Sequence, residues 1–567
     1  MDQSSFKSKW ALLQILIILC FTSASLQQQF ALTEALLSSP LTNRIDDQNY
    51  NILHSLQLIS QAPCQIRLLN ATELLYGASQ LCHEMLNQFP TLNESNIELW
   101  LQKSLGFLAD HAKGSKSITL PTNQSLSVPS AHLSGLPMVR RSLLAQLVHG
   151  WLTGLQRQLS TRLEPLLVQL ISQMYDIHRD SVVHRGVMQY HHISKSGGTA
   201  WNQAARANGC VVPVTLGNHV RGFGDECRWL DPKVYGNMTG GRLILWARWG
   251  QYRRPALGQS CWNRFFNVAG AGMSYISNEY TLIGGREKGN FRGAHSCPQF
   301  VNVVTLRHPR RRLESALRFI QIYIRGYWRR DDPLHGTERY KLRFCNATAD
   351  LWRALAPAVV DNYIVRSFLG ESGFHTPPGL LNDSHLEVAR DQLLQFDLVL
   401  DLEGGREEND RMVQQGLGWP AAWSKANQTL NSTLLYQSFH HECGMRPEVL
   451  QELQRSQKYD MRLYMFSWVL NQLDSVWLSA SRALGLRPET APGALEHGRG
   501  PQDIRCGMLW QGGNGSTLGR ALDSLGLLER QAPPPPQSVR TDGRPRLRNS
   551  QGTRSRSARR RSEMRWR

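Results

Sequence analysis

Two segments of this 567-residue chain each predict a strand that runs directly into a helix through residues suited to binding an anion. The first segment is Gln189-Tyr-His-His-Ile-Ser-Lys-Ser-Gly-Gly-Thr-Ala-Trp-Asn202. Its two glycines let the backbone approach a ligand closely, and the positive end of the following helix favours negative charge. The second segment is Val301-Asn-Val-Val-Thr-Leu-Arg-His-Pro-Arg-Arg-Arg-Leu-Glu-Ser315, in which Pro309 is placed to begin a helix. Together the two junctions predict a ligand with two separated anionic groups.

The first junction is predicted to bind one anion through residues 194–199, which we call the anion loop. Adjacent glycines and the start of the helix direct consecutive N–H groups toward one point. Lys195 adds a positive charge on a flexible stem. The candidate ligands are Ser194, Lys195, Ser196, Gly197, Gly198 and Thr199, and the N–H groups of the last four are expected to face the anion.

The second junction is predicted to bind the other anion through side chains. Arg307 ends the strand, and Arg312 and Ser315 come round on the first turns of the helix. A guanidinium group binds phosphate through paired hydrogen bonds that lysine cannot reproduce. For Arg312, an ordinary cation on an exposed helix turn is an equally open interpretation.

A magnesium-dependent nucleotide triphosphatase is the main competing interpretation of these junctions. Its loop has the form G-x-x-x-x-G-K-[ST], and its second strand ends in an aspartate that holds Mg²⁺. Here the lysine precedes the glycines, and the second strand ends in Arg307. The cysteines and histidines also lack the spacing of a zinc site. The sequence therefore predicts an anion site without a metal.

The anion loop resembles the 5′-phosphosulfate loop of Golgi carbohydrate sulfotransferases, which use 3′-phosphoadenosine 5′-phosphosulfate (PAPS), and residues 306–315 resemble their 3′-phosphate motif. The heparan sulfate 6-O-sulfotransferase type is the most similar branch. Weaker similarities follow in the family's order at residues 362–366, 386–403 and 460–464, so the resemblance covers roughly residues 186–475. It implies an α/β fold with a P-loop NTPase-like parallel sheet flanked by helices. It also implies PAPS as co-substrate, no metal, and transfer of a sulfuryl group to a glycan hydroxyl.

The resemblance further implies roles for individual residues. Lys195 is expected to neutralise the leaving oxygen, while the amides of the two glycines and Thr199 hold the 5′-phosphate. The family's catalytic histidine lies in a short motif between the two cofactor sites, but the corresponding residues 272–280 contain none. Glu279 is therefore the first candidate base and His295 the second; the alternatives are a structural carboxylate and an ordinary loop histidine. Residues 191 and 192, both histidines, are expected in packing or tautomer-locked hydrogen bonds, and the acceptor position stays open.

The N-terminal sequence predicts entry into the secretory pathway. Lys7 and Lys9 precede seventeen uncharged, mostly apolar residues at 10–26. This length lies between a signal-peptide core of about 7 to 15 residues and the roughly 20 that span a bilayer. A type II Golgi membrane anchor with a lumenal catalytic domain and a cleaved signal with secretion are both compatible. Nine N-x-[ST] sequons agree with a lumenal location, and they start at Asn70, Asn93, Asn123, Asn237, Asn346, Asn382, Asn427, Asn431 and Asn514.

Composition and hydropathy divide the chain into four predicted parts. Residues 1–26 form the signal anchor or signal peptide, and residues 27–180 a mainly helical stem or N-terminal region that acts as a spacer, a dimerising coil or a cover for the catalytic domain. Residues 181–485 form the sulfotransferase domain, because short apolar strands alternate with helices, as in a parallel sheet. These strands are predicted at 187–193, 243–247, 273–277, 300–306 and 398–402. Residues 486–567 form a loosely ordered basic tail.

Charge and cysteine content bear on partners. The last 28 residues contain eleven arginines and two acidic residues, a net charge of +9 out of +19 for the chain. This tail predicts capture of an acidic polysaccharide or a membrane surface, or else a solvated segment; the lumenal signals argue against nucleic acid. Nine cysteines outside the apolar segment predict disulfides. A glycan or glycoprotein is the expected acceptor, with a protein-tyrosine sulfotransferase or a non-catalytic lumenal glycan-binding protein as alternatives and the oligomeric state open.

Overall fold

The computed structural model of the protein describes residues 52–65, 94–112, 115–119, 125–129, 135–153, 163–212, 229–239, 247–250, 260–270, 273–285, 290–327, 346–420, 445–488 and 506–509. The apolar segment at 10–26 and the arginine-rich tail at 540–567 lie outside these residues. Among the helices that are described, none combines the length and apolar character needed to cross a membrane.

A four-stranded parallel sheet forms the centre of the molecule. Its strands lie in the order β4, β3, β5, β6, so that β3 and β5 are adjacent interior strands. Every residue of the four strands is buried, as expected for a parallel sheet covered by helices on both faces. The predicted α/β class, with a parallel sheet flanked by helices, is therefore confirmed. The strands are β3 (Met188–His191), β4 (Tyr275–Asn278), β5 (Val301–Leu306) and β6 (Leu398–Asp401).

Four of the five predicted strands coincide with strands of the sheet. Apolar, β-branched runs such as Val301 to Leu306 are typical of strands buried on both faces. The helix before β3 ends at Gly186, whose φ of 65° is a left-handed conformation that glycine adopts readily, and β3 begins two residues later. Most of the fifth prediction, residues 243–247, lies outside the described residues.

The described parts of the N-terminal region are mainly helical and include one β-hairpin. It contains α3 (Ile52–Gln61), η2 (Ala62–Gln65), α5 (Glu94–Ala112), α6 (Leu136–Thr153) and α7 (Glu164–Arg185). Between α5 and α6 the chain forms an antiparallel hairpin of β1 (Ser115–Thr119) and β2 (Ser125–Pro129). The α3 helix packs against α6, and α5 packs against α7.

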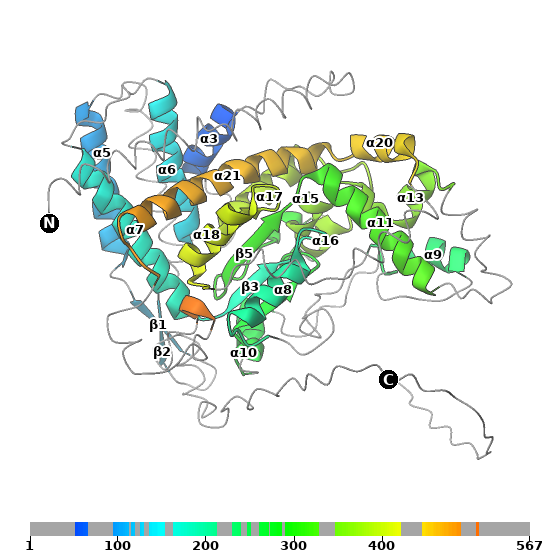
Figure 1. Ribbon diagram of the computed structural model, residues 1–567, viewed down its shortest axis with the longest axis horizontal. Helices are drawn as coiled ribbons and strands as arrows, with labels where there is room; N and C mark the ends of the chain where they lie inside the picture. Colours follow the sequence, from blue (N-terminus) through cyan, green and yellow to red (C-terminus); the bar gives the residue numbers. More distant parts are fainter. Residues whose placement is uncertain are drawn as a thin grey trace, which may run out of the picture.

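The remaining helices surround the sheet. The long helix α21 contacts β6, α17, α18 and the N-terminal helices α6 and α7, and in Figure 1 it runs the length of the sheet. The helices α3, α5 and α6 gather at one end of the molecule, and α9, α11, α13 and α20 at the other. Their bounds are α8 (Gly198–Ala207), α9 (Pro232–Thr239), α10 (Cys261–Gly270), η6 (Phe291–Gly293), α11 (Pro309–Tyr327), α13 (Ala349–Leu355), α14 (Pro357–Val360), α15 (Tyr363–Ser367), α16 (Gly370–Phe374), α17 (Asp383–Leu394), α18 (Arg406–Leu417), α20 (Pro447–Arg455), α21 (Lys458–Ala483) and η10 (Gly507–Leu509).

A buried ion cluster joins the N-terminal helices to the sheet. Arg140 and Arg141 of α6 bind Asp474 of α21 at 2.9 and 2.6 Å, and all three side chains are fully buried. Burial alone would raise the pKa of Asp474, but the two guanidinium groups lower it below its usual value. The Nη1 atom of Arg141 also donates to the carbonyl oxygen of Leu394, just before β6. The helices at 136–185 are thus packed into the same core as the sheet.

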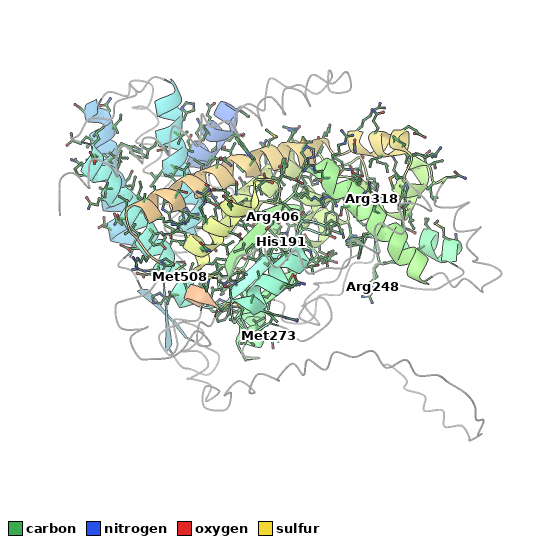
Figure 2. All side chains as sticks on the ribbon, in the orientation of Figure 1. His191, Arg248, Met273, Arg318, Arg406 and Met508 are labelled. Atoms are coloured by element: carbon green, nitrogen blue, oxygen red, sulfur yellow. A yellow bond between two sulfur atoms is a disulfide. The ribbon has the colours of Figure 1, made fainter. Side chains whose placement is uncertain are left out.

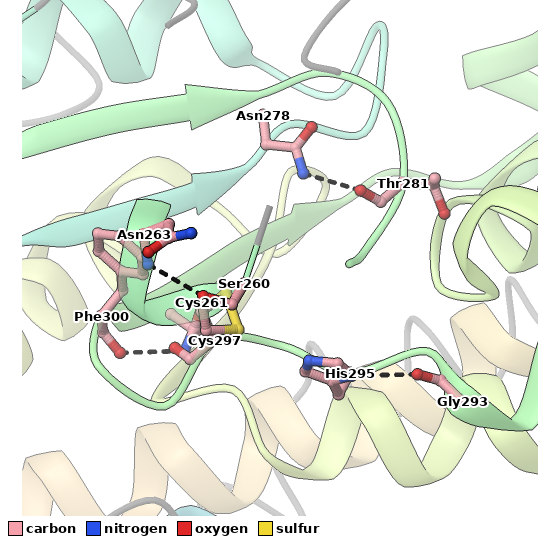
Figure 3. The surroundings of a disulfide bond; sticks show 10 residues. Ser260, Cys261, Asn263, Asn278, Thr281, Gly293, His295, Cys297 and Phe300 are labelled. Carbon is pink, nitrogen blue, oxygen red and sulfur yellow. Dashed lines mark hydrogen bonds between the residues drawn. A yellow bond between two sulfur atoms is a disulfide. The ribbon is translucent and has the colours of Figure 1, made fainter. Parts of the chain in front are cut away.

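Two disulfides are present among the described residues, in agreement with the predicted use of cysteine. Cys261 at the start of α10 pairs with Cys297 just before β5 (Figure 3). Cys210, after α8, pairs with Cys506, at a sequence separation of 296. The segment Cys506 to Leu509 is buried between α7 and α18, although it falls within the range predicted as a basic tail.

Two histidines are buried in the core, His191 on β3 and His178 on α7. His191 lies near the centre of the molecule (Figure 2) and packs between Phe368 and Phe396. Burial lowers the pKa of His191 to about 3 and that of His178 to about 4. Both rings are therefore neutral in the folded protein at mildly acidic pH, where an unfolded chain would protonate them.

We expect His191 to weaken the fold as the pH falls. An unfolded histidine binds a proton near pH 6.5 and the folded one only near pH 3, so its contribution is full above 6.5 and is lost steadily below it. Asp401 and Asp460 act in the opposite direction, because burial raises the pKa of each to about 6. The substitution His191→Phe should therefore reduce the loss of unfolding free energy between pH 7 and pH 5 by about 2 kcal/mol. Urea titrations at both pH values measure this difference, and an unchanged difference would contradict the assignment.

Candidate functional site

The two predicted junctions meet at the carboxyl edge of the sheet. β3 and β5 pair in parallel, with His191 opposite Val304, so the segments that follow them emerge side by side. The Nη1 atom of Arg307, just after β5, donates to the carbonyl oxygen of Lys195 in the anion loop at 3.2 Å. The structure therefore brings Arg307 and the anion loop into direct contact.

The anion loop has an unusual backbone. Lys195 has a φ of 69° and Gly197 a φ of 91°, both in the left-handed region that costs energy for a lysine. The N–H of Ser196 donates to the carbonyl oxygen of Ile193 at 3.0 Å and closes the turn. The prediction that this N–H faces the anion is therefore wrong, because the left-handed turn at Lys195 directs it back toward the strand.

Several polar groups of the loop have no partner among the described residues. The N–H groups of Gly197, Gly198 and Thr199 lie at the start of α8, where the first N–H groups of a helix have no carbonyl partner within the helix. The hydroxyls of Ser194 and Ser196 are buried, and neither has a hydrogen-bond partner within the described parts of the chain. Buried polar groups are normally paired, so these atoms are the candidates for binding a ligand at the loop.

Gly198 has no room for a side chain. A Cβ atom built there would lie 1.9 Å from Nε2 of His192, whose ring lies against the first turn of α8. The ring of His192 stacks on the ring of Tyr190, with 5.6 Å between the ring centres. The backbone N–H of His192 also donates to the carbonyl oxygen of Asn278 at 2.8 Å, so both the ring and the backbone of this residue are held in place.

We expect Gly198→Ala to lower the free energy of unfolding by about 1–3 kcal/mol, the usual cost of overpacking. The added methyl group must displace the His192 ring or the start of α8. A matched control is Gly106→Ala in α5, where no atom lies within 4 Å of an added Cβ and the alanine should stabilise the helix by about 0.5–1 kcal/mol. Urea titrations compare the two variants. Equal effects at both glycines would mean that the anion loop accommodates a side chain.

The side chain of Lys195 packs against an aromatic ring beside the anion loop. Its Nζ atom lies 4.0 Å from the ring centre of Phe319 on α11, a distance at which a cation is attracted to the ring. Phe319 packs edge-on against Trp229, and the indole Nε1 of Trp229 donates to the hydroxyl of Tyr363 at 3.3 Å. Phe319, which contacts the lysine, is thus held in place by Trp229, and Trp229 in turn by Tyr363.

The three predicted residues of the second junction have different surroundings. Arg307 is partly exposed and lies between Glu403, at 3.4 Å, and the anion loop. Ser315 is partly buried on α11. Arg312 is fully buried, donates from Nη2 to the carbonyl oxygen of Val359 at 2.8 Å and packs over the ring of Tyr363.

The interpretation of Arg312 as a cation on an exposed helix turn is wrong, because its face of α11 packs against α14 and α21. Burial lowers the pKa of Arg312, and the negative charge of Asp460 opposes that effect. Its Nε and Nη1 atoms have no hydrogen-bond partner in the described parts of the chain. Two nitrogen atoms of this buried guanidinium thus lack a hydrogen-bond partner among the described residues.

The two predicted bases occupy different surroundings. Glu279 directly follows β4, and its Oε2 lies 3.7 Å from Nδ1 of His192 beside the anion loop. His295 lies between η6 and the Cys261–Cys297 disulfide (Figure 3). The ring Nδ1 of His295 is 3.0 Å from the carbonyl oxygen of Gly293. The backbone N–H of His295 donates to the carbonyl oxygen of Ile283 at 2.8 Å.

The weaker similarity segments at 362–366 and 460–464 bind each other. The side-chain oxygen of Asn362 accepts from the N–H groups of Tyr459 and Asp460 at the start of α21. In return, the carboxylate of Asp460 accepts from the N–H groups of Ile364 and Val365 at the start of α15. These reciprocal helix caps were missed from the sequence, where the only signal was an Asn and an Asp at the two helix starts.

A metal site is not apparent in the described parts of the chain, where no group of three or more His, Cys, Asp or Glu side chains is placed to hold an ion. Comparisons of the whole chain with known protein families, with curated proteins and with solved structures gave no match.

Proposed function

We propose that this protein is a sulfotransferase with a P-loop NTPase-like sheet, which moves a sulfuryl group from PAPS to a hydroxyl of a glycan. The observation that carries the proposal is the contact between the two junctions, in which Arg307 donates to the carbonyl oxygen of Lys195. Two anion-binding elements on adjacent parallel strands suit a nucleotide that is phosphorylated at both its 3′ and 5′ positions. Ligands of open α/β sheets bind at this carboxyl edge.

The residues present fit such a donor. The N–H groups of Gly197, Gly198 and Thr199 and the hydroxyls of Ser194 and Ser196 would hold the 5′ end, since they are the polar groups left without partners among the described residues. Arg307 would bind the 3′-phosphate, with Ser315 and the unpaired donors of Arg312 as further contacts. PAPS supplies an activated sulfuryl group when it is bound. Lys195 would neutralise the negative charge that develops on the leaving phosphate oxygen.

A location in the Golgi lumen is part of the proposal. The three sequons within the described residues start at Asn237, Asn346 and Asn382, and all three asparagines are exposed. Two disulfides are compatible with an oxidising compartment. The segment at 1–26 would anchor the chain as a type II membrane protein or be cleaved for secretion, and the basic tail would attract an acidic glycan or glycoprotein acceptor.

Calorimetry with adenosine 3′,5′-bisphosphate tests the nucleotide site directly. We expect saturable binding of one nucleotide per chain, weakened by Arg307→Lys because lysine cannot form the bidentate contact. Adenosine 5′-monophosphate is the matched control ligand and should bind much more weakly, since it lacks the 3′-phosphate that the second junction would bind. Absence of binding, or equal affinity for the two nucleotides, would overturn the proposal.

Incubation with labelled PAPS distinguishes the proposed activity from its alternatives. The acceptors to compare are desulfated heparin, desulfated chondroitin and tyrosine-containing peptides. Transfer to a glycan supports the proposal, and transfer to peptides alone would favour a protein-tyrosine sulfotransferase. Nucleotide binding without transfer would favour a non-catalytic glycan-binding protein.

A further inference from the structure

The imidazole of His192 is in direct contact with the anion loop. Its Nε2 atom is the atom nearest to the position that a Cβ on Gly198 would occupy, at 1.9 Å. Gly198 is also the first residue of α8, so Nε2 lies beside the N–H groups that would hold the anionic end of the donor. A general base must stand within hydrogen-bond reach of the reacting group, and the His192 ring lies beside the loop that would hold the donor.

Glu279 stands on the other side of the same ring. Its Oε2 is 3.7 Å from Nδ1 of His192, and both side chains are largely buried, with exposures of 16% and 12%. A carboxylate at this position favours the tautomer with hydrogen on Nδ1, which leaves the lone pair on Nε2, toward the loop. Stacking on Tyr190 further restricts the ring. Such contacts are often longer before substrate binds, so 3.7 Å is compatible with a hydrogen bond in the active complex.

The electrostatic surroundings suit a neutral imidazole that gains a proton during the reaction. The positive end of α8 disfavours an imidazolium before a donor binds. Glu279 stabilises the imidazolium once it forms, as the acidic member of a catalytic triad does. Further titratable groups on the surrounding elements are Lys195 in the anion loop, Arg206 on α8, His191 and Tyr190 on β3, Tyr275 on β4 and Arg264 on α10.

The other candidate bases are less well placed. The described contacts of His295 are with Gly293 and Ile283, in the segment that leads to β5. His375 has both ring nitrogens engaged, Nε2 by the hydroxyl of Tyr280 at 2.8 Å and Nδ1 by the N–H of Gly250 at 3.2 Å. Among these histidines, His192 is the one whose ring touches the anion loop.

We propose that His192 is the catalytic base and that Glu279 is its positioning residue. This inference rests on the proposed sulfotransferase function. The acceptor hydroxyl oxygen forms a bond to sulfur, and the bond between sulfur and the 5′-phosphate oxygen breaks. Its electron pair stays on that phosphate oxygen beside Lys195. The hydroxyl proton passes to Nε2 of His192 and later leaves to solvent.

The test compares His192→Asn with the matched control His184→Asn, which replaces a partly exposed histidine on α7. We expect His192→Asn to lower kcat for glycan sulfation by about 100-fold or more, the usual contribution of a general base. Its affinity for adenosine 3′,5′-bisphosphate, measured by calorimetry, should stay within a few-fold of the wild type. His184→Asn should leave both quantities unchanged.

Chemical rescue separates a base from a structural ring. His192→Ala leaves a space beside Gly198, and added imidazole should restore part of the lost rate. The rescued rate should increase with the basicity of a series of substituted imidazoles, because proton transfer follows the strength of the base. Glu279→Gln keeps the His192 ring and should lower kcat about tenfold or more with little change in KM. Its pH–rate profile should also shift, since the carboxylate no longer favours the imidazolium.

The outcomes distinguish the base assignment from the proposed function. Normal transfer by His192→Asn, or a comparable loss in His295→Asn alone, would overturn the role of His192 and leave the sulfotransferase proposal intact. A wild-type protein that binds no nucleotide, or binds it and transfers to no acceptor, would overturn both. If His192→Asn fails to fold, Glu279→Gln decides, and full activity with an unchanged pH profile would overturn the assignment.

Discussion

Replacement of Lys195 by methionine is expected to lower the rate of sulfuryl transfer by about 100- to 1,000-fold, the usual effect of removing one group that stabilises transition-state charge. Methionine keeps an unbranched stem beside Phe319 and must adopt the same left-handed backbone, where φ is 69°. The change therefore isolates the ammonium group. Binding of the donor PAPS should weaken much less than the rate falls, because the lysine acts mainly on charge that PAPS lacks and that develops on the leaving oxygen during the reaction.

Initial rates at saturating PAPS measure this effect. The control is Lys233→Met on α9, whose lysine is exposed and lies outside the anion loop, and whose rate should equal that of the wild type. A normal rate in Lys195→Met would remove Lys195 from the mechanism. Loss of nucleotide affinity in proportion to the rate would instead assign it to binding alone.

Replacement of Asp474 by asparagine is expected to lower the free energy of unfolding by about 3–5 kcal/mol. The neutral amide would leave Arg140 and Arg141 buried without the carboxylate that now binds both of them. A control is Asp350→Asn, which weakens an ion pair with Arg353 whose side chains are 89% and 39% exposed. Such surface pairs contribute about 0–1 kcal/mol. The loss of unfolding free energy, measured by urea titration, should therefore be several-fold larger for Asp474→Asn than for Asp350→Asn. A small loss for Asp474→Asn would mean that other groups stabilise the two buried arginines.

The same cluster bears on fragments of the protein. A chain that begins near residue 181 would lack Arg140 and Arg141, so Asp474 would lose both of the arginines that bind it. It would also expose the side of α21 that now packs on α6 and α7. We therefore expect the sheet and the N-terminal helices to unfold in one transition.

The parallel sheet was predictable from the sequence because its strands carry their own signal. A run such as Val301 to Leu306 is apolar throughout, and Pro309 shortly after it can begin a helix but cannot continue a strand. Gly197 and Gly198 similarly identify a tight turn. Local patterns of this kind depend only on neighbouring residues.

Much of the site depends instead on long-range packing. The burial of Arg312 follows from the rotation of α11 against α14 and α21, which its local sequence does not define. The approach of Glu279 to His192 follows from the pairing of β3 with β4 across 87 residues of sequence. The N–H of Ser196 turns away from the predicted anion because Lys195 adopts a left-handed conformation that is rare for lysine.

The Cys210–Cys506 bond has a consequence for how the protein is made. The chain between these cysteines forms a closed ring that includes β4, β5 and β6, whereas β3 precedes the ring and is inserted between two of its strands. At about 5–20 residues per second, a ribosome needs roughly 15–60 seconds to add the 296 positions that separate the two cysteines. Throughout that interval the thiol at the end of α8 has no cysteine at 506 to join. A premature stop codon before position 506 would prevent the disulfide bond at Cys210 from forming, even after every strand of the sheet had been translated.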